Sequence, residues 1–430
     1  MPLKYLTIFL LINCFAFSCY RGAEKQENIF RYNEQTGIAS IDPAFAKNQS
    51  IMWAIHQLYN TLVDVDSQLN IVPSVAKRWE ISADKKIYTF FLRNDVFFHD
   101  DPCFPNAKGR RLIASDVEYS FKRIMDRTTA SPGSWVFNRK VDSVNGFKAL
   151  NDTTFQLKLV QPFNPMFGIL SMQYCSIVPR EAVEKYGNDF RRHAVGTGPF
   201  QFVAWEEGQA LVLKRNPNYF EVDSSGKRLP YLDGVKVSFY DSKATEFLLF
   251  RQDKLEFIND IDASFKDEVL TKMGTLRSAW KDKIQLQTHP YLNIEYFGIL
   301  VDSTNPLLKG SPLRFKKVRQ AINYGFDRQK MVLYLRNSLG IPAESGFVPA
   351  GLPSFDSTKV HGYHYDPVKA RQLLREAGIS GGTMTPIKLQ TIPIYSDIAS
   401  YIAKQLEGIG LNVQVDVIQK SLLLDLTSNS

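Results

Sequence analysis

The fold class is decided by residues 387–417, which read IKLQTIPIYSDIASYIAKQLEGIGLNVQVDV. Ile387–Ile392 has the apolar pattern of a strand, and Ser396–Leu406 places its apolar residues at helical spacing. Leu411–Val417 then alternates between apolar and polar residues, as a second strand does. A strand, a helix and a strand at this spacing form a βαβ unit, whose two strands lie parallel in one sheet. The sequence therefore predicts an α/β protein.

Two helices are predicted upstream of this unit, and both begin at a proline that follows a capping residue. Ser311 precedes Pro312, and Asp366 precedes a second helix that ends at Gly378. Proline suits the first turn of a helix, where its missing N–H costs nothing, and glycine suits the position just after the end. The C-terminal part of the chain thus alternates helices and strands.

The part of the chain before about Pro290 is richer in strands. Turn residues separate short runs of β-branched and aromatic residues, which is the pattern of mixed and antiparallel sheets. Phe200–Trp205 and Ala210–Lys214 flank a four-residue turn and predict a β-hairpin. The other predicted strands are Ile29–Tyr32, Lys86–Arg93, Val96–His99, Phe155–Leu159, Val235–Phe239 and Leu255–Phe257, and the predicted helices are Ile51–Leu62, a helix from Asp116 with Ser115 as its N-cap, and Thr245–Arg251.

Length and charge restrict the possible functions. The chain has 430 residues, which is too many for one hydrophobic core and indicates two or three lobes. The net charge is +8, but Lys and Arg are spread along the sequence, and the densest runs, Lys108–Arg111 and Lys316–Arg319, are short. Because nucleic-acid binding needs a concentrated basic surface, we expect no nucleic-acid partner.

The N-terminal residues predict export. Lys4 precedes an apolar run, Leu6–Phe17, that is too short to span a bilayer and has the length of a signal-peptide core. The run ends in Ala16-Phe17-Ser18-Cys19, which resembles a bacterial lipobox, although Phe17 replaces a small residue. We therefore expect a lipoprotein signal over residues 1–19, a lipid on Cys19 and a polar tether over residues 20–28. A plain secretory signal cleaved nearby is the alternative.

Four cysteines are present, and export accounts for two of them. Cys14 lies in the signal segment and Cys19 in the lipobox-like motif. Cys103 and Cys175 remain, in a compartment where disulfides persist, so the two could pair. The sequence cannot place them within bonding distance, and two free thiols stay an equal alternative.

No catalytic constellation is visible. Nucleophile elbows, phosphate-binding loops, dinucleotide fingerprints and zinc-binding spacings are all missing from the sequence. His361 and His364 lie three residues apart in a loop, and the Ser-x-x-Lys pairs at Ser82 and Ser224 lie in polar turns where such a short motif arises by chance. We predict a protein that is not an enzyme, with no cofactor and no metal.

Several separate stretches, in order along the chain from about Ile29 onward, carry a family resemblance. They are Thr36-Gly-Ile-Ala-Ser-Ile-Asp-Pro43, Val72-Pro-Ser-Val-Ala-Lys-Arg-Trp79, Tyr88-Thr-Phe-Phe-Leu-Arg93 with Val96-Phe-Phe-His-Asp100 and Ala114-Ser-Asp-Val117, Gly196-Thr-Gly-Pro-Phe200, and Phe315 to Ile322 with Asp327-Arg328. In sequence and order they resemble the family 5 extracellular solute-binding proteins, which include the oligopeptide- and dipeptide-binding proteins of ABC transporters. Asp101 departs from the family by replacing a glycine before an insertion that holds Cys103.

The resemblance implies a two-sided clamp of three lobes, of the class II periplasmic-binding-protein type, with mixed sheets and flanking helices. Lobe I is expected at 28–60 and 190–282, an inserted, strand-rich lobe II at 61–189, and lobe III from 283 to 430, with a hinge near His289–Phe297. The family's lobe III continues further and carries there the acidic residue that holds a peptide's amino group. The resemblance thus implies an incomplete lobe III, and weak peptide binding by these 430 residues alone.

The resemblance also implies a ligand and partners. Peptide-binding relatives pair main chain to main chain with an extended ligand, at positions that match Gly37, Ile38 and Ala39 here. Gly37 could instead serve a strand irregularity. Tyr291, Asn293, Tyr296 and Tyr395 are further candidates for the walls of the interlobe cleft, with packing in the core as the alternative.

The expected protein is a monomer on the periplasmic or cell-surface side of the bacterial inner membrane. It would deliver peptides to an ABC permease and its ATPase, touching the membrane only through its lipid. Two alternatives stay open: the same fold with another cargo, such as a metal chelate, a sugar or an opine, and a surface peptide-binding chaperone without a permease.

Overall fold

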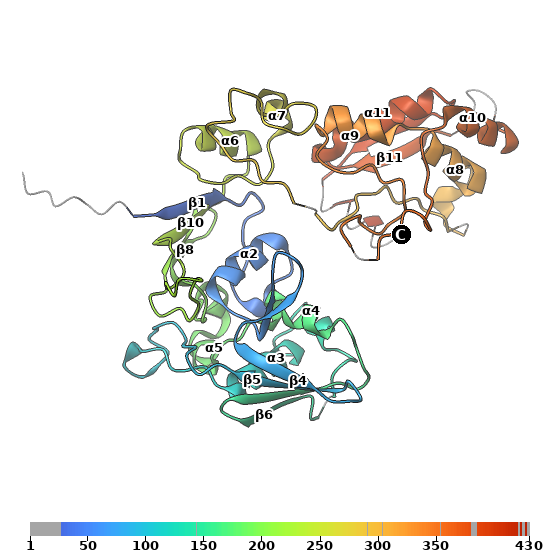
Figure 1. Cartoon of the computed structure of the whole chain (residues 1–430). Coiled ribbons are helices and arrows are strands. Elements are labelled where there is room, and N and C mark those ends of the chain that lie inside the picture. The colour runs from blue at the N-terminus through green and yellow to red at the C-terminus, as the bar shows by residue number, and fades with distance from the viewer. Residues whose placement is uncertain are drawn as a thin grey trace, which may run out of the picture. The chain divides into compact units, whose positions relative to one another are not determined.

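A computed structural model describes residues 27–419, apart from 143, 290, 303, 353 and 380–384, together with 422, 423, 426 and 427. The signal segment, Cys14 and Cys19 lie outside these residues. The chain divides into two compact units, the first ending at Ile261 and the second beginning at Asp262 (Figure 1). The three predicted lobe boundaries stay predictions.

The first unit contains a four-stranded mixed sheet built from two distant parts of the sequence. Its strands lie in the order β1-β10-β9-β8, with β1 parallel to β10 and the other pairs antiparallel. The predicted hairpin is confirmed as β8 and β9. The bounds are Ile29–Asn33 for β1, Phe200–Glu206 for β8, Ala210–Arg215 for β9 and Gly234–Ser238 for β10.

A second four-stranded sheet, wholly antiparallel, forms from the intervening sequence in the order β4-β5-β7-β6. Helix α3 (Ala114–Met125) packs on it, and its fully buried Phe121 meets Phe155 of β7 edge to face, with ring centroids 5.6 Å apart. Such aromatic pairs add to the burial of a core. The bounds are Ala76–Ile81 for β4, Ile87–Leu92 for β5, Phe147–Asn151 for β6 and Thr154–Lys158 for β7.

The start of α3 differs from the prediction. The N-cap is Ile113 rather than Ser115, and the helix includes Ser115. The reason is Asp116, whose carboxylate accepts the Ile113 N–H at 2.9 Å and so satisfies one of the backbone donors that the helix start leaves open.

Two other predicted strands are reduced to single bridges. Val96–His99 contributes only the bridge between Phe97 and Arg111, and Leu255–Phe257 only the bridge between Phe257 and Tyr32. The first unit also contains a small β2–β3 ladder, short helices and 3₁₀ turns. These are η1 (Pro43–Phe45), α2 (Gln49–Leu58), β2 (Val63–Val65), β3 (Ile71–Pro73), η2 (Pro105–Ala107), η3 (Ser134–Val136), α4 (Met166–Leu170), η4 (Gln173–Cys175), α5 (Arg180–Tyr186), η5 (Gly187–Arg192) and α6 (Lys243–Arg251).

The second unit confirms the predicted βαβ motif. Strands β11 (Ile387–Thr391) and β12 (Val413–Val417) pair in parallel, and α11 (Ser396–Glu407) connects them and packs on β12 (Figure 1). The helix expected at Pro312 is split into two, because Phe315 has an extended backbone. The other elements are α7 (Ala263–Val269), η6 (Pro306–Leu308), η7 (Pro312–Arg314), α8 (Lys316–Tyr324), α9 (Arg328–Leu335), α10 (Pro367–Glu376) and η8 (Pro393–Tyr395).

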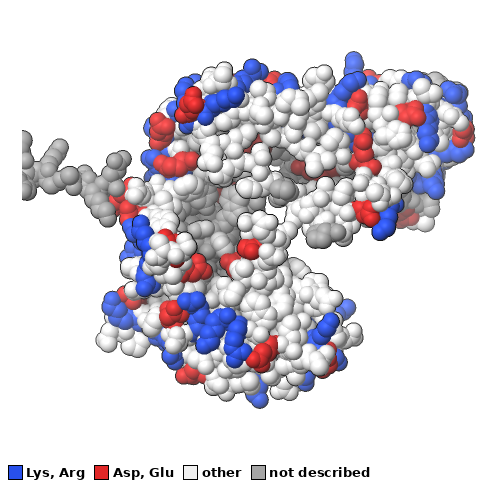
Figure 2. All heavy atoms as spheres, viewed as in Figure 1, with Lys and Arg blue, Asp and Glu red and all other residues white. Residues whose placement is uncertain are grey.

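Both units therefore have the mixed α/β architecture that the sequence predicts. No helix in the described part of the chain combines the length and apolar character that crossing a bilayer requires. On the face that Figure 2 presents, Lys and Arg are interspersed with Asp and Glu.

Candidate ligand-binding site

Gly37, Ile38 and Ala39 lie just after β1, outside any strand. Gly37 closes a turn by donating its N–H to the Glu34 carbonyl at 3.1 Å, and its φ is +67°. A Cβ at Gly37 would meet nothing within 4 Å, so the left-handed backbone, rather than crowding within the chain, explains the glycine.

The segment after Gly37 has unused main-chain groups. Within the described chain, no hydrogen bond involves the N–H groups of Ile38, Ala39 and Ser40 or the carbonyl of Ile38. The Ile38 side chain packs against the core, whereas Ala39 is exposed. Because backbone groups in folded proteins are nearly always paired, by protein, water or ligand, this run of open donors is available to a ligand.

The open segment is fixed at both ends. Ser50 of α2 donates its hydroxyl to the Gly37 carbonyl at 2.9 Å. At the other end, the Ile41 N–H donates to the Arg191 carbonyl at 2.8 Å, and the next residue, Asp42, forms a buried ion pair with Arg123 of α3. The free groups between these anchors are therefore presented by a held backbone, which lowers the cost of ordering it on binding.

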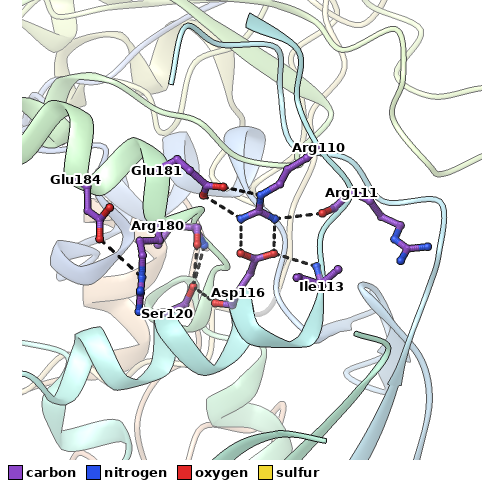
Figure 3. Close-up of polar contacts among 9 residues, drawn as sticks. Arg110, Arg111, Ile113, Asp116, Ser120, Arg180, Glu181 and Glu184 are labelled. Carbon is purple, nitrogen blue, oxygen red and sulfur yellow. Dashed lines mark hydrogen bonds and ion pairs between the residues drawn. The ribbon is translucent and has the colours of Figure 1, made fainter. Parts of the chain in front are cut away.

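A charged cluster beside α3 brings two carboxylates, Asp116 and Glu181, to one guanidinium, that of Arg110 (Figure 3). Arg110 donates to both Asp116 oxygens, at 2.8 and 2.7 Å, and to both Glu181 oxygens, at 2.6 and 2.9 Å. The guanidinium holds the pKa of Glu181 below its usual range. Both carboxylates pair with the same guanidinium, so the cluster ties α3 to α5 rather than supplying an acid or base.

The two remaining cysteines are free thiols, so the disulfide considered from the sequence is not formed. Cys103 lies in the loop before η2, where its N–H donates to Asp101 at 2.7 Å, and Cys175 is buried in η4. Burial, and to a lesser degree Asp101, raises the pKa of Cys103 to about 12, and burial raises the pKa of Cys175 further. Both thiols are therefore protonated and unreactive at neutral pH. No group of three or more potential metal ligands occurs among the residues that the structure describes.

The candidates of the second unit lie on an irregular segment before η6. Tyr291 is 73% exposed and Tyr296 69% exposed, and Asn293 is exposed too, so packing in the core is the wrong interpretation for all three. The Tyr296 ring meets Phe347 edge to face at 5.4 Å. Large exposed aromatic rings such as these can contact a ligand on the surface of this unit.

Tyr395, the last candidate, connects to this segment through a residue that the sequence did not single out. Its hydroxyl donates to Glu295 Oε1 at 2.8 Å. Burial and Glu295 raise the pKa of Tyr395 to about 12, so the hydroxyl keeps its proton. No local signal in the sequence points to Glu295, because its partner Tyr395 lies 100 positions away.

The comparisons with known proteins begin with the protein families. The model of the bacterial extracellular solute-binding proteins, family 5, matches residues 70–429. Such proteins bind solutes and are not enzymes, in agreement with the sequence-based prediction.

Three curated relatives illustrate the similarity. The glutathione-binding protein GsiB of Pectobacterium atrosepticum is 26% identical over 379 residues, the dipeptide-binding protein of Escherichia coli is 27% identical over 370, and the heme-binding protein A of Haemophilus influenzae is 29% identical over 352. The alignments cover 87%, 82% and 78% of this chain but only 66%, 63% and 59% of the relatives, so the chain spans less than two thirds of their length.

Solved structures share the fold. The periplasmic binding protein DppA of Helicobacter pylori, in complex with the peptide STSA, superposes with a TM-score of 0.71 at 24% identity, over 92% of this chain and 74% of that one. The dipeptide-binding protein of Pseudoalteromonas sp. SM9913, in complex with Met-Leu, gives 0.73 at 20% identity, over 93% and 78%. The fold is that of the periplasmic binding proteins, and with a family model matched over most of its length, the chain belongs to the bacterial extracellular solute-binding proteins of family 5.

Proposed function

We propose that this chain is the substrate-binding lipoprotein of a peptide-importing ABC transporter. It captures peptides between its lobes and delivers them to a permease and its ATPase. The observation that carries the proposal is the anchored segment Ile38–Ser40, whose main-chain donors have no partner within the described chain. An extended peptide can add to such groups as a strand does, whatever its side chains are. A peptide is the cargo that matches a row of main-chain donors best.

A cargo other than a peptide is the second candidate, because one relative is a heme-binding protein at 29% identity. Heme has no main chain that could pair as a strand does, so it would use the Ile38–Ser40 donors only through its two propionates. Ligand-detected NMR on the purified chain, with di- to pentapeptides, glutathione and hemin at up to millimolar concentrations, separates the two. Saturation transfer to peptides supports the proposal. Transfer to hemin alone would overturn it.

Lipid anchoring at Cys19 belongs to the same proposal and rests on the lipobox-like sequence that ends there. A covalently bound lipid keeps a soluble domain at the membrane by burying its acyl chains. Cys19→Ala should move the protein from the membrane fraction to the soluble fraction and abolish labelling by a fatty acid. Ser18→Ala, which retains a small residue at that step, is the control and should remain bound. Equal membrane binding by wild type and Cys19→Ala would contradict the anchor.

A further inference from the structure

Glu295 carries a charge that the second unit does not neutralise. It is exposed, and no Lys or Arg among the described residues lies within ion-pair distance of it. Among the described residues, the one hydrogen-bond partner of its side chain is the neutral hydroxyl of Tyr395. That bond joins residues 100 positions apart and restricts the carboxylate to one orientation, whereas an ordinary surface glutamate rotates freely in water.

Among the described residues, the neighbouring charges leave the Glu295 carboxylate uncompensated. Arg336 lies close enough to Tyr395 to act on its hydroxyl electrostatically, but it donates to both oxygens of Asp397, at 2.7 and 3.1 Å. Arg336 and Asp397 therefore cancel each other, and Glu295 remains as the uncompensated charge of the cluster. The net charge of +8 belongs to the whole chain, and salt screens charges more than about 8 Å away at physiological ionic strength. The local carboxylate thus dominates what a ligand meets.

Aromatic rings complete the environment. Tyr291 lies close enough to Tyr395 to influence its hydroxyl electrostatically, and both Tyr291 and Tyr296 expose most of their surface. A carboxylate beside exposed tyrosine faces favours ammonium and guanidinium groups, which gain from the ion pair and from the ring quadrupole together. Anionic and purely aliphatic groups gain from neither.

We propose that Glu295, positioned by Tyr395, selects peptides that carry a basic side chain. The inference rests on the proposed function, since it assigns to the second unit a residue that discriminates among the peptides. A lysine or arginine side chain suits an exposed carboxylate because its long aliphatic stem can lie along the rings while its charged end stays partly hydrated.

The test compares four peptides, Ala-X-Ala with X as lysine, arginine, norleucine or glutamate, by calorimetry on the full chain. Lysine and arginine peptides should bind about three- to tenfold more tightly than the norleucine peptide, as expected for a partly exposed ion pair supported by aromatic rings. Acetylating the amino terminus should leave this ratio unchanged, which distinguishes a side-chain preference from recognition of the α-amino group.

Variants then assign the preference to the residue. Glu295→Gln keeps an oxygen that accepts the Tyr395 hydrogen bond but removes the charge, so the lysine and norleucine peptides should bind equally. Glu407→Gln, an exposed change at the end of α11, is the matched control and should retain the ratio. Equal affinity of wild type for all four peptides, or a preference that survives Glu295→Gln, would overturn the inference and leave the proposed function standing. Binding of none of them would overturn both.

Discussion

The two candidate surfaces differ in what they offer a ligand. Residues 38–40 of the first unit present main-chain donors on a backbone that is held at both ends. Residues 291–296 of the second unit present exposed tyrosines and an oriented carboxylate on a segment without helix or strand. Main-chain groups bind every peptide alike, whereas side chains discriminate. Under the two proposals, main-chain groups of the first unit supply affinity and side chains of the second unit supply selectivity, and the following predictions test each part.

The largest loss of stability is expected from a substitution at the ion pair that anchors the first surface. The Asp42–Arg123 pair is buried, with 4% and 14% of the two side chains exposed, and directly follows the open segment. Arg123→Met would leave the Asp42 carboxylate buried without its counter-ion, which typically costs about 3 kcal/mol or more. Urea unfolding followed by tryptophan fluorescence should report this loss, because Trp53, Trp79, Trp135 and Trp205 all belong to the first unit.

Lys122, the residue before Arg123 on α3, provides the control. Lys122 pairs with Glu118 one turn earlier on the same helix, but its side chain is 56% exposed. Exposed pairs of this kind contribute about 0.5 kcal/mol or less. If Lys122→Met lowered the free energy of unfolding as much as Arg123→Met, helix propensity rather than the buried ion pair would explain the result. That outcome would contradict the anchoring role of Asp42.

A second difference between the units is their response to acid. His99 is 3% exposed and makes ring contacts with the Gly198 carbonyl at 3.0 Å and the Gly196 N–H at 3.4 Å, whereas His289, His361 and His364 of the second unit are exposed. Burial lowers the pKa of His99 from 6.5 to about 4. The unfolded chain therefore takes up this proton first, so the stabilisation is complete above about pH 6.5 and disappears as the pH falls towards 4.

The free energy of unfolding of the first unit should accordingly fall by about 2 kcal/mol between pH 7 and pH 5, a range in which most carboxylates remain ionised. Urea titrations at the two pH values measure the change. His99→Gln should remove the dependence, while His56→Gln, at an exposed position of α2, should retain it. A pH-independent wild type would show that His99 is not held neutral by the fold.

A smaller effect is expected at Gly37. Its φ of +67° costs a residue with a Cβ about 1 kcal/mol, although a Cβ would have free space. Gly37→Ala should therefore destabilise the first unit by about that amount. Gly168→Ala is the matched control, because Gly168 also has nothing within 4 Å but lies in the helix α4, where alanine is favoured over glycine. Equal effects of the two substitutions would contradict the role assigned to the left-handed turn.

The sequence predicted elements whose local pattern and tertiary role agree. The β8–β9 hairpin and the β11–α11–β12 unit were predicted because their apolar periodicity is the one that packing uses. Strand β4 was not predicted, since it lies at a sheet edge and exposes Lys77, Arg78 and Glu80, which gives it no alternation. Only pairing with β5 makes it a strand.

For the candidate site residues, too, the sequence is informative only where a local pattern marks the residue. Gly37, Ile38 and Ala39 are candidates because a family motif marks them. Which of their main-chain groups stay open depends on tertiary hydrogen bonds that involve Ser50 and Arg191 and that the sequence does not show. Glu295 was missed because its significance comes from Tyr395, which no local pattern places beside it. A hydrogen bond between distant residues cannot be read from spacing, whereas the identity of a turn glycine can.

The central claim is that the main chain of Ile38–Ser40 binds the main chain of a peptide. Hydrogen exchange of these amides, followed by mass spectrometry with and without saturating peptide, tests it most directly. The account predicts fast exchange in the free protein, because these N–H groups have no partner within the described chain, and slow exchange in the complex. A peptide of the same sequence with reduced (CH2–NH) peptide bonds, which lack the carbonyls that would accept from these N–H groups, should fail to give this protection. Exchange that is equally fast with and without bound peptide would contradict the claim.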